Sequence, residues 1–359
     1  MKVPHIVGVD LSKESIDFFS HQLQSHLKID NAASGFRLML NWLKDQKISF
    51  SQAMLVMEHT GLYSYHLEAF LHKHQIRFSK VPALAIKRSL GLIRGKNDKI
   101  DAQRIARFGF EKRDMLVEAS EPDKAMERLS MLHSTRDRLV KHRASLICAV
   151  KEYKRILKES DSIIQSQLRL IKSFAEQIKK METEIDELIE KQQSVNQNFN
   201  LLKSIKGIGK VTATAAIIKT GNFKRFSTAR KFACYCGTAP FEHSSGKSIQ
   251  RKTRISHLAD KGMKTLLDQA AKSAIQYDKE LKSYYQRRIK EGKSKKSTIN
   301  IVRNKLLYRM FAIIKRQTPF IENYLQTAKN HFLWFVNLRI RKGKMRCRES
   351  LLNEDDILT

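Results

Sequence analysis

The sequence is poor in cysteine and has no long apolar run, and each shortage excludes a class of protein. Its four cysteines include no Cys-X-X-Cys pair, so we expect reduced thiols rather than a zinc site or a disulfide framework. No apolar run is long enough to span a bilayer, and the first residues lead into a strand pattern rather than a signal peptide. These absences predict a cytoplasmic protein with no membrane partner.

Acidic residues are scarce relative to basic ones. The chain has 68 Lys and Arg against 36 Asp and Glu, a formal net charge of +32. Such a charge makes a polyanion the expected partner, and its spread over the whole chain favours nucleic acid over a membrane surface. Residues 203–316 contain 28 basic and 6 acidic residues, so this segment holds +22 of the total.

Glycine and proline are absent between Pro122 and Gly207, and so long a gap predicts helices. Apolar residues recur there at alternating spacings of three and four, which is typical of a coiled-coil seam. The polar residues 192–200 are expected to turn the chain. The seam residues are Leu146, Val150, Tyr153, Leu157, Ile171, Phe174, Ile178, Met181, Ile185 and Leu188.

Short apolar runs alternate with helical patterns before this segment. They predict an α/β layer, in which ligands bind outside the carboxyl ends of the parallel strands. Asp10 and Glu58 each end a predicted strand and would meet there if the two strands are neighbours. Strand patterns cover residues 3–9, 15–20, 53–57 and 76–82, and helical patterns cover residues 34–46, 63–74 and 100–110.

Four acidic residues, Asp10, Glu58, Asp98 and Asp101, lie at the ends of these elements. One interpretation is a two-metal site in which the carboxylates hold paired Mg²⁺ ions against a phosphodiester. The other is structural, with Asp98 and Asp101 serving the start of a helix and the other two as ordinary loop carboxylates. Of the nearby histidines, only His59 is a candidate contact for a metal-bound phosphate. The residues alone leave both interpretations open.

Gly207-Ile208-Gly209 interrupts an apolar helical pattern and resembles the hairpin of a helix-hairpin-helix element. Exposed backbone N–H groups of such a hairpin bind a DNA phosphate without reading sequence. We therefore predict nucleic-acid contacts at Gly207 and Gly209 and at the flanking Lys206 and Lys210. A plain turn between two helices is the alternative.

A cationic segment at residues 240–254 separates two predicted helices, 222–239 and 255–274, and contains Ser244-Ser245-Gly246-Lys247-Ser248. A serine there could attack phosphorus if nearby cations stabilise its alkoxide. Taken alone, Ser-Ser-Gly is more typical of an ordinary loop. The residues predicted to contact phosphate in this segment are Lys247, Arg251, Lys252 and Arg254.

Five short motifs follow one another along the chain: Gly-Val-Asp-Leu-Ser-Lys at 8–13, Met-Glu-His-Thr-Gly-Leu-Tyr at 57–63, Lys-Asn-Asp-Lys-Ile-Asp-Ala at 96–102, Ile-Lys-Gly-Ile-Gly at 205–209 and Ser-Ser-Gly-Lys at 244–247. In order and spacing they resemble the insertion-sequence-110 transposase family, from about residue 3 to residue 316. The sequence departs from the family pattern at Asn97, where threonine is usual. Since both residues cap helices, the departure changes little.

The resemblance implies a RuvC-like domain of the RNase-H fold at residues 1–115, with an Asp-Glu-Asp-Asp tetrad on Asp10, Glu58, Asp98 and Asp101. It further implies a helical coiled-coil dimerisation region at 116–200 and a mainly helical transposase domain at 201–320. A basic extension would follow at 321–359. The nucleophile would be Ser245, with Ser244 as the alternative.

The resemblance also implies cofactors and partners. Mg²⁺ is expected, two ions per site, with Mn²⁺ as a possible substitute. Donor DNA, target DNA and a structured bridge RNA would bind, and the chain would form homodimers and a tetramer in the synaptic complex. Such a protein would associate with the bacterial nucleoid when bound to DNA.

Together these features predict an insertion-element transposase in which Ser245 attacks a DNA phosphodiester. A RuvC-like nuclease or junction resolvase, using metal-activated water, is the first alternative. A non-catalytic nucleic-acid-binding scaffold is the second. An actin-like ATPase is disfavoured, since the Leu-Ser-Lys-Glu turn after Asp10 lacks the glycine of such a phosphate loop.

Overall fold

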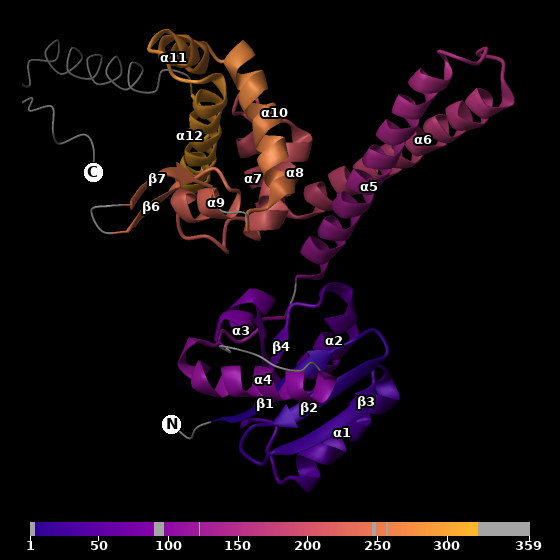
Figure 1. Ribbon diagram of the computed structural model, residues 1–359, viewed down its shortest axis with the longest axis vertical. Helices are drawn as coiled ribbons and strands as arrows, with labels where there is room; N and C mark the ends of the chain where they lie inside the picture. Colours follow the sequence, from indigo (N-terminus) through magenta and orange to yellow (C-terminus); the bar gives the residue numbers. More distant parts are fainter. Residues whose placement is uncertain (1–3, 90–96, 122, 246–248, 256–257, 322–359) are drawn as a thin grey trace, which may run out of the picture. The chain divides into compact units, whose positions relative to one another are not determined.

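The computed structural model describes residues 4–89, 97–121, 123–245, 249–255 and 258–321, with the backbone alone for residues 242–254. The chain divides into two compact units between Pro122 and Asp123 (Figure 1). The first unit contains a mixed sheet with helices, and the second is mostly helical. An α/β N-terminal part followed by helices was expected, and this coarse order is confirmed.

The sheet of the first unit has five strands in the order β3-β2-β1-β4-β5. The first three strands form an antiparallel meander, and β4 and β5 continue parallel to β1. The expected hairpin and the central parallel pair are confirmed, whereas β3 was not predicted. The strands are β1 (His5–Leu11), β2 (Ser15–Ser20), β3 (Ser25–Asp30), β4 (Ala53–Glu58) and β5 (Arg77–Val81).

Helices cover both faces of this sheet. Helices α1 (Ala33–Asp45) and α2 (Tyr65–Lys73) pack on the face formed by Val7 and Val9, with their neighbours on β4. Helices α3 (Ala83–Ser89) and α4 (Asp98–Glu111) pack on the opposite face, which includes Ile6. Because side chains alternate along a strand, Gly8 and Asp10 lie on the same face as Ile6.

Gly8 lets α4 approach β1 unusually closely. A Cβ atom on Gly8 would lie 2.2 Å from the carbonyl oxygen of Ala102 and 2.3 Å from the backbone nitrogen of Ala106. Both alanines are fully buried. Only glycine on the strand and small residues on the helix allow this contact, which fixes the start of α4 beside the end of β1.

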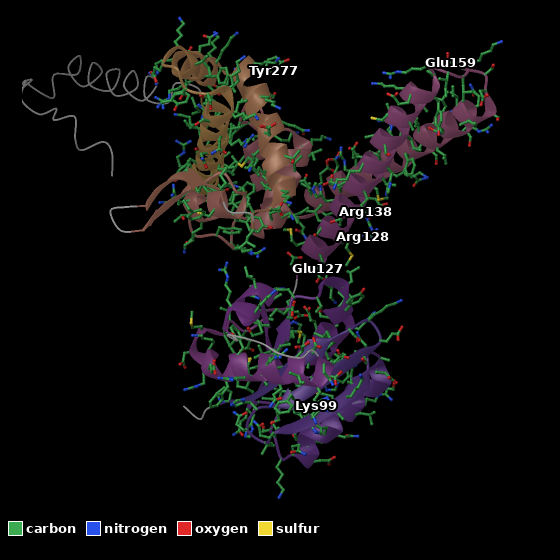
Figure 2. The ribbon with its side chains drawn as sticks, viewed as in Figure 1. Lys99, Glu127, Arg128, Arg138, Glu159 and Tyr277 are labelled. Atoms are coloured by element: carbon green, nitrogen blue, oxygen red, sulfur yellow. The ribbon has the colours of Figure 1, made fainter. Side chains whose placement is uncertain are left out.

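Helix α4 begins with a cap from Asn97, one of the two residues, Asn97 and Asp98, that the sequence offers for this role. Asn97 is extended, and its side-chain oxygen accepts a hydrogen bond of 3.0 Å from the backbone N–H of Lys99, at the start of the helix in Figure 2. Asp98 and Asp101 are therefore not needed as caps. The helix starts two residues before the predicted Ile100.

The second unit begins with two long helices, α5 (Lys124–Tyr153) and α6 (Ser162–Lys191), which pack against each other. Arg128 on α5 lies 3.0 Å from Glu184 on α6, and the rings of His142 and Phe174 stack. Figure 2 shows Glu159 in the connection between these helices. The predicted seam residue Phe174 thus contacts the same chain.

Helices α7 to α12 and a two-stranded hairpin complete this unit around one apolar core. Among the described residues, no helix is long and apolar enough to cross a membrane. The elements are α7 (Gln193–Lys203), α8 (Lys210–Thr220), α9 (Ala229–Tyr235), β6 (Phe241–Ser245), β7 (Ile249–Arg254), α10 (Lys261–Tyr277), α11 (Lys279–Lys290) and α12 (Lys295–Arg316).

The predicted turn at residues 192–200 is wrong, because α7 occupies this segment. Its polar residues surround a buried stripe, Val195, Phe199 and Leu202, at helical spacing. The helix predicted at 222–239 is shortened to α9, since Asn222 and Phe223 have positive φ angles of 54° and 66°. The apolar stripe in the first segment and the positive φ angles in the second, rather than composition, determine the backbone.

The segment predicted as a loop at 240–254 contains the β6–β7 hairpin. The helix predicted from residue 255 begins only at Lys261, after Asp260, whose carboxylate accepts a hydrogen bond of 2.7 Å from the N–H of Met263. The segment is therefore a hairpin that leads to a capped helix.

Candidate active site

Strand register brings Asp10 and Glu58 to the same edge of the sheet. Parallel pairing of β1 with β4 places Val9 opposite Met57, and the two acids follow directly. Both lie on the face that carries α4, because Asp10 alternates with Gly8 and Glu58 alternates with Val56. The strands are neighbours, which is the condition that the sequence set for the two acids to meet at this edge.

Helix α4 adds its two acids to this edge. Ala102 lies against Gly8, and Asp98 is one helical turn before Ala102. Asp101 directly precedes Ala102 and lies in the first turn of α4, as Asp98 does. The close packing of α4 on β1 therefore sets where both aspartates stand relative to Asp10.

The pKa of Asp10 reflects both its burial and its acidic neighbours. Burial raises the pKa of the Asp10 carboxyl from its ordinary 3.8 to about 6. Nearby carboxylates add to this increase, in the order Asp101, Asp98, Asp17 and Glu58. Negative charges gathered in this way repel one another, and a bound cation would relieve the repulsion.

Basic side chains partly compensate the acids. Arg104 Nη1 lies 2.8 Å from Asp101 Oδ1, one turn along α4, and both side chains are largely buried. Lys28 Nζ lies 3.8 Å from Asp98 Oδ2, and both of these side chains are exposed. The pair at Asp101 is consequently the firmer of the two.

Asp17 is a fifth acid at this edge, and the sequence-based search missed it. Antiparallel register places it directly opposite Asp10, and it is only 3% exposed. Its Oδ1 lies 2.6 Å from His26 Nε2, and its Oδ2 lies 3.7 Å from Lys28 Nζ. The predicted turn at residues 11–14 did not reveal this pairing, because counting outward from it pairs residue 10 with residue 15, whereas the observed register pairs Asp10 with Asp17.

The chemistry of the donor set fits a divalent metal ion. Carboxylate oxygens are the ligands that Mg²⁺ and Mn²⁺ take in phosphoryl-transfer sites, and clustered negative charge favours binding of a cation. In the described part of the chain, no three His, Cys, Asp or Glu side chains stand close enough to hold one ion as they are. Coordination would thus require side chains such as Asp101 to turn away from their present partners.

The predicted serine lies at the end of a strand. Ser245 is the last residue of β6, paired with Ile249, and Ser244 pairs with Gln250. The side chains of both serines, and those of Arg251, Lys252 and Arg254 on β7, lie outside the described residues, as does Lys247 entirely. The roles predicted for these residues therefore remain predictions.

The base of this hairpin is held by helix α12. Thr238 is fully buried, and its carbonyl oxygen accepts hydrogen bonds from the side-chain amides of Asn300 (2.8 Å) and Asn304 (2.9 Å). Its hydroxyl donates to Asn304 Oδ1 at 2.8 Å. Gly237, with a φ of 64°, leaves no room for a Cβ beside Ala259. These contacts fix the point at which the hairpin leaves the helical core.

The Gly-Ile-Gly segment connects α7 to α8, and its two glycines differ. Gly207 has a φ of 94° and packs so closely on α10 that a Cβ would lie 2.5 Å from the carbonyl oxygen of Ala270. Gly209 faces open space and begins α8 without a side-chain cap. Lys210 Nζ pairs with Asp186 Oδ2 at 2.7 Å. Packing thus accounts for Gly207, and the phosphate contacts predicted for Lys206, Gly207, Gly209 and Lys210 remain untested.

Two family models match separate parts of the chain. A transposase model of the DEDD type of IS110 elements matches residues 7–159, which include all four acids of the predicted tetrad. A second model, described as transposase of the IS116/IS110/IS902 family, matches residues 199–286. The match to a DEDD domain agrees with an RNase-H-like fold for the first unit and suggests use of a divalent metal.

Relatives extend the similarity over most of the chain. The pilin gene-inverting protein of Moraxella bovis is 28% identical over 326 residues, covering 88% of this chain and 97% of that protein. The transposase for insertion sequence element IS1111A of Coxiella burnetii is 24% identical over 251 residues, covering 63% of this chain and 68% of that protein. With both family models in the order of the resemblance, the chain belongs to the IS110 family of transposases, which are DNA strand-transfer enzymes.

Proposed function

We propose that this transposase excises and inserts its element by serine attack, with the acids at the edge of the first sheet assisting at the phosphate. The observation that carries the proposal is the convergence of the carboxyl ends of β1 and β4 with the start of α4 in a domain that matches DEDD transposases. The four acids concerned are Asp10, Glu58, Asp98 and Asp101.

In the proposed reaction, Ser245 Oγ bonds to the phosphorus of a DNA phosphodiester, and the bond from phosphorus to the 3′ oxygen breaks. The proton lost by the serine is balanced by the proton gained by the leaving 3′-hydroxyl. A 3′-hydroxyl of the exchanged strand then attacks the phosphoserine and releases the serine. Because the number of phosphoester bonds is conserved, no ATP is consumed.

The four acids would hold Mg²⁺, two ions per site, and Mn²⁺ could replace it. When bound, such ions supply positive charge that stabilises the phosphate as it is attacked. Asp10, whose pKa is raised to about 6 chiefly by burial, would anchor the set from β1. Asp98 and Asp101 would complete it from the helix that Gly8 allows to approach.

The proposed partners are donor DNA, target DNA and a structured bridge RNA that pairs with both. The +32 net charge supports a protein that binds several polyanions. Phosphate contacts are proposed at the glycine turn and along the serine hairpin. The residues concerned are Lys206, Gly207, Gly209, Lys210, Lys247, Arg251, Lys252 and Arg254.

The proposed assembly is a homodimer, and a tetramer when two DNA sites are joined. The exposed sides of the α5–α6 pair would supply the coiled-coil contact between subunits. The proposed division places the catalytic domain at 1–115, this helical region at 116–200, the serine domain at 201–320 and a basic extension at 321–359. Such a protein would act in the bacterial cytoplasm, at the nucleoid.

The serine step is tested with Ser245→Ala, using Ser244→Ala as the matched control. Incubation with donor DNA and denaturing electrophoresis measures both strand cleavage and protein bound covalently to DNA. We expect Ser245→Ala to abolish both and Ser244→Ala to retain both. Cleavage by Ser245→Ala without a covalent adduct would instead support a metal-dependent nuclease or junction resolvase.

The guide is tested by sequencing RNA that copurifies with the protein and repeating recombination with and without it. Full activity after complete removal of RNA would refute guidance by a bridge RNA.

Asp10→Asn should abolish excision and insertion. This variant separates a catalyst from a binding scaffold, because a scaffold would tolerate the change.

A second candidate outcome is DNA inversion, favoured by the relatives named pilin gene-inverting proteins. The same strand exchange inverts or excises a segment according to the relative orientation of its two sites. A plasmid carrying the sites in inverted orientation distinguishes the outcomes, since inversion changes the restriction pattern without loss of DNA.

A further inference from the structure

Asp17 and Lys28 flank the acidic cluster, and the proposed reaction assigns neither a role. Asp17 faces Asp10 across the β1–β2 pair, where directly opposed side chains have Cβ atoms about 4.5–5.5 Å apart. Two carboxylates in this arrangement repel each other, and Asp17 adds to the forces that disfavour the charged form of Asp10. Its charge therefore acts on the site.

The β2–β3 hairpin holds Asp17 in place. Lys28 is its direct partner across β2 and β3, and His26 is diagonal to it. His26 Nε2 lies 2.6 Å from Asp17 Oδ1. This short contact fixes one oxygen of the Asp17 carboxylate, which is almost fully buried beside Asp10.

Lys28 bridges two acids from different elements. Its Nζ lies 3.7 Å from Asp17 on β2 and 3.8 Å from Asp98 on α4. Half of the Lys28 side chain is exposed, at 54%, so the ammonium group is weakly held and can move away. A positive charge at this position competes with any cation that approaches Asp98.

We propose that Asp17 and Lys28 are positioning residues that set the cation affinity of the acidic site in opposite directions. Asp17 strengthens cation binding by adding a fixed negative charge beside Asp10. Lys28 weakens it, because its ammonium group must leave Asp98 before a cation can bind there. The inference rests on the part of the proposed function in which the acids hold divalent metal.

The test is Mn²⁺ binding to the full-length protein, freed of nucleic acid, by isothermal titration calorimetry at fixed pH and salt. Asp17→Asn should weaken binding about tenfold, because it removes a buried charge next to the site. Lys28→Gln should tighten binding about threefold, the smaller effect expected of a solvated charge. Changes of Mn²⁺ affinity in opposite directions distinguish this role from a structural one, which would weaken Mn²⁺ binding in both variants.

Matched controls come from the opposite face of the same unit. Asp45→Asn and Lys44→Gln change the same charges at the exposed end of α1 and should leave Mn²⁺ affinity unchanged. Thermal unfolding in chelator checks that each variant is folded. If Asp17→Asn fails to fold, Mn²⁺ binding by Lys28→Gln still tests the inference, because the Lys28 side chain is exposed.

Unchanged affinity in Lys28→Gln, or a change of the same sign in both variants, would overturn the inference while the metal site stands. Absence of Mn²⁺ binding by the wild-type protein would remove the metal site and this inference together. Binding that survives Asp10→Asn unchanged would place the ion elsewhere and have the same consequence. The failure of the inference and the failure of the proposed function are thus distinguishable.

Discussion

At the scale of the residue, burial and acidic neighbours make the charged form of Asp10 unfavourable in the folded chain. Its carboxyl has a pKa raised from 3.8 to about 6, chiefly by burial. The folded chain therefore binds this proton more tightly than the unfolded chain does. Stability falls as the pH rises through that interval, and the deficit persists above it.

Asp10→Asn should remove the loss of stability that the ionised Asp10 carboxyl causes. In chelator at neutral pH we expect the variant to be more stable than the wild type by about 2 kcal/mol, after allowance for solvent screening. The difference should disappear below about pH 3, where the wild-type carboxyl is protonated in both states. Urea unfolding of both proteins across this range measures it, and a wild type that is the more stable at neutral pH would contradict the account.

Asn97 provides a second residue-scale prediction. Asn97→Ala should cost about 1 kcal/mol of unfolding free energy, because the first turn of α4 loses its only side-chain cap among the described contacts. Asn97→Thr should retain most of the stability, since a threonine hydroxyl can accept the same N–H. Urea denaturation tests both, and equal losses in the two variants would refute the capping role.

At the scale of the element, the contact between α4 and β1 decides whether the acids meet. Gly8→Ala would place a Cβ against backbone atoms of α4, which cannot move without moving Asp98 and Asp101. We expect a loss of about 3 kcal/mol and of strand transfer. Gly61→Ala is the control, because Gly61 has a φ of 70° but open space around it, so about 1 kcal/mol should be lost. Equal effects in an unfolding assay would contradict the packing argument.

The attachment of the β6–β7 hairpin to α12 makes another element-scale prediction. Asn304→Ala removes two hydrogen bonds to Thr238 and should slow covalent adduct formation about tenfold. DNA affinity should be unchanged, since Asn304 lies at the base of the hairpin. Asn200→Ala, which removes an exposed amide pair with Asn196, is the control. A parallel loss of affinity and rate would show that the network only maintains the fold.

The element scale also shows how much the sequence could predict. Strands β1 and β4 were predictable because most of their residues are apolar, as expected of buried parallel strands. Strand β3 was missed because Ser25–Asp30 is polar and mostly half-exposed. Helix α7 was missed because glutamine and asparagine mask its apolar stripe.

The sequence identified a site residue only where an acidic side chain also lies at or near the end of a predicted strand or helix. The four acids lie at or near the ends of elements, whereas Asp17 lies inside β2 and is recognised only from the register. The close contact at Gly8 depends on how α4 packs, which local sequence does not specify. Lys28 and Arg104 became candidates only through their distances to the acids.

At the scale of the whole molecule, charge dominates expected behaviour. A chain with a +32 net charge should release many counterions on binding nucleic acid. We expect its affinity for duplex DNA of arbitrary sequence to fall by about a thousandfold between 50 and 200 mM salt. Fluorescence anisotropy across this range measures the slope, and a nearly flat dependence would exclude phosphate contacts as the main source of affinity.

The most direct test of the central claim is to identify the residue that becomes joined to DNA. A donor strand nicked near its cleavage site traps the covalent intermediate, and mass spectrometry of the digested complex locates the modified peptide. The account predicts a phosphodiester link to Ser245, formed only with divalent metal and lost in Asp10→Asn. Efficient cleavage of the same DNA by the wild-type protein, with no covalent link to any residue, would contradict it.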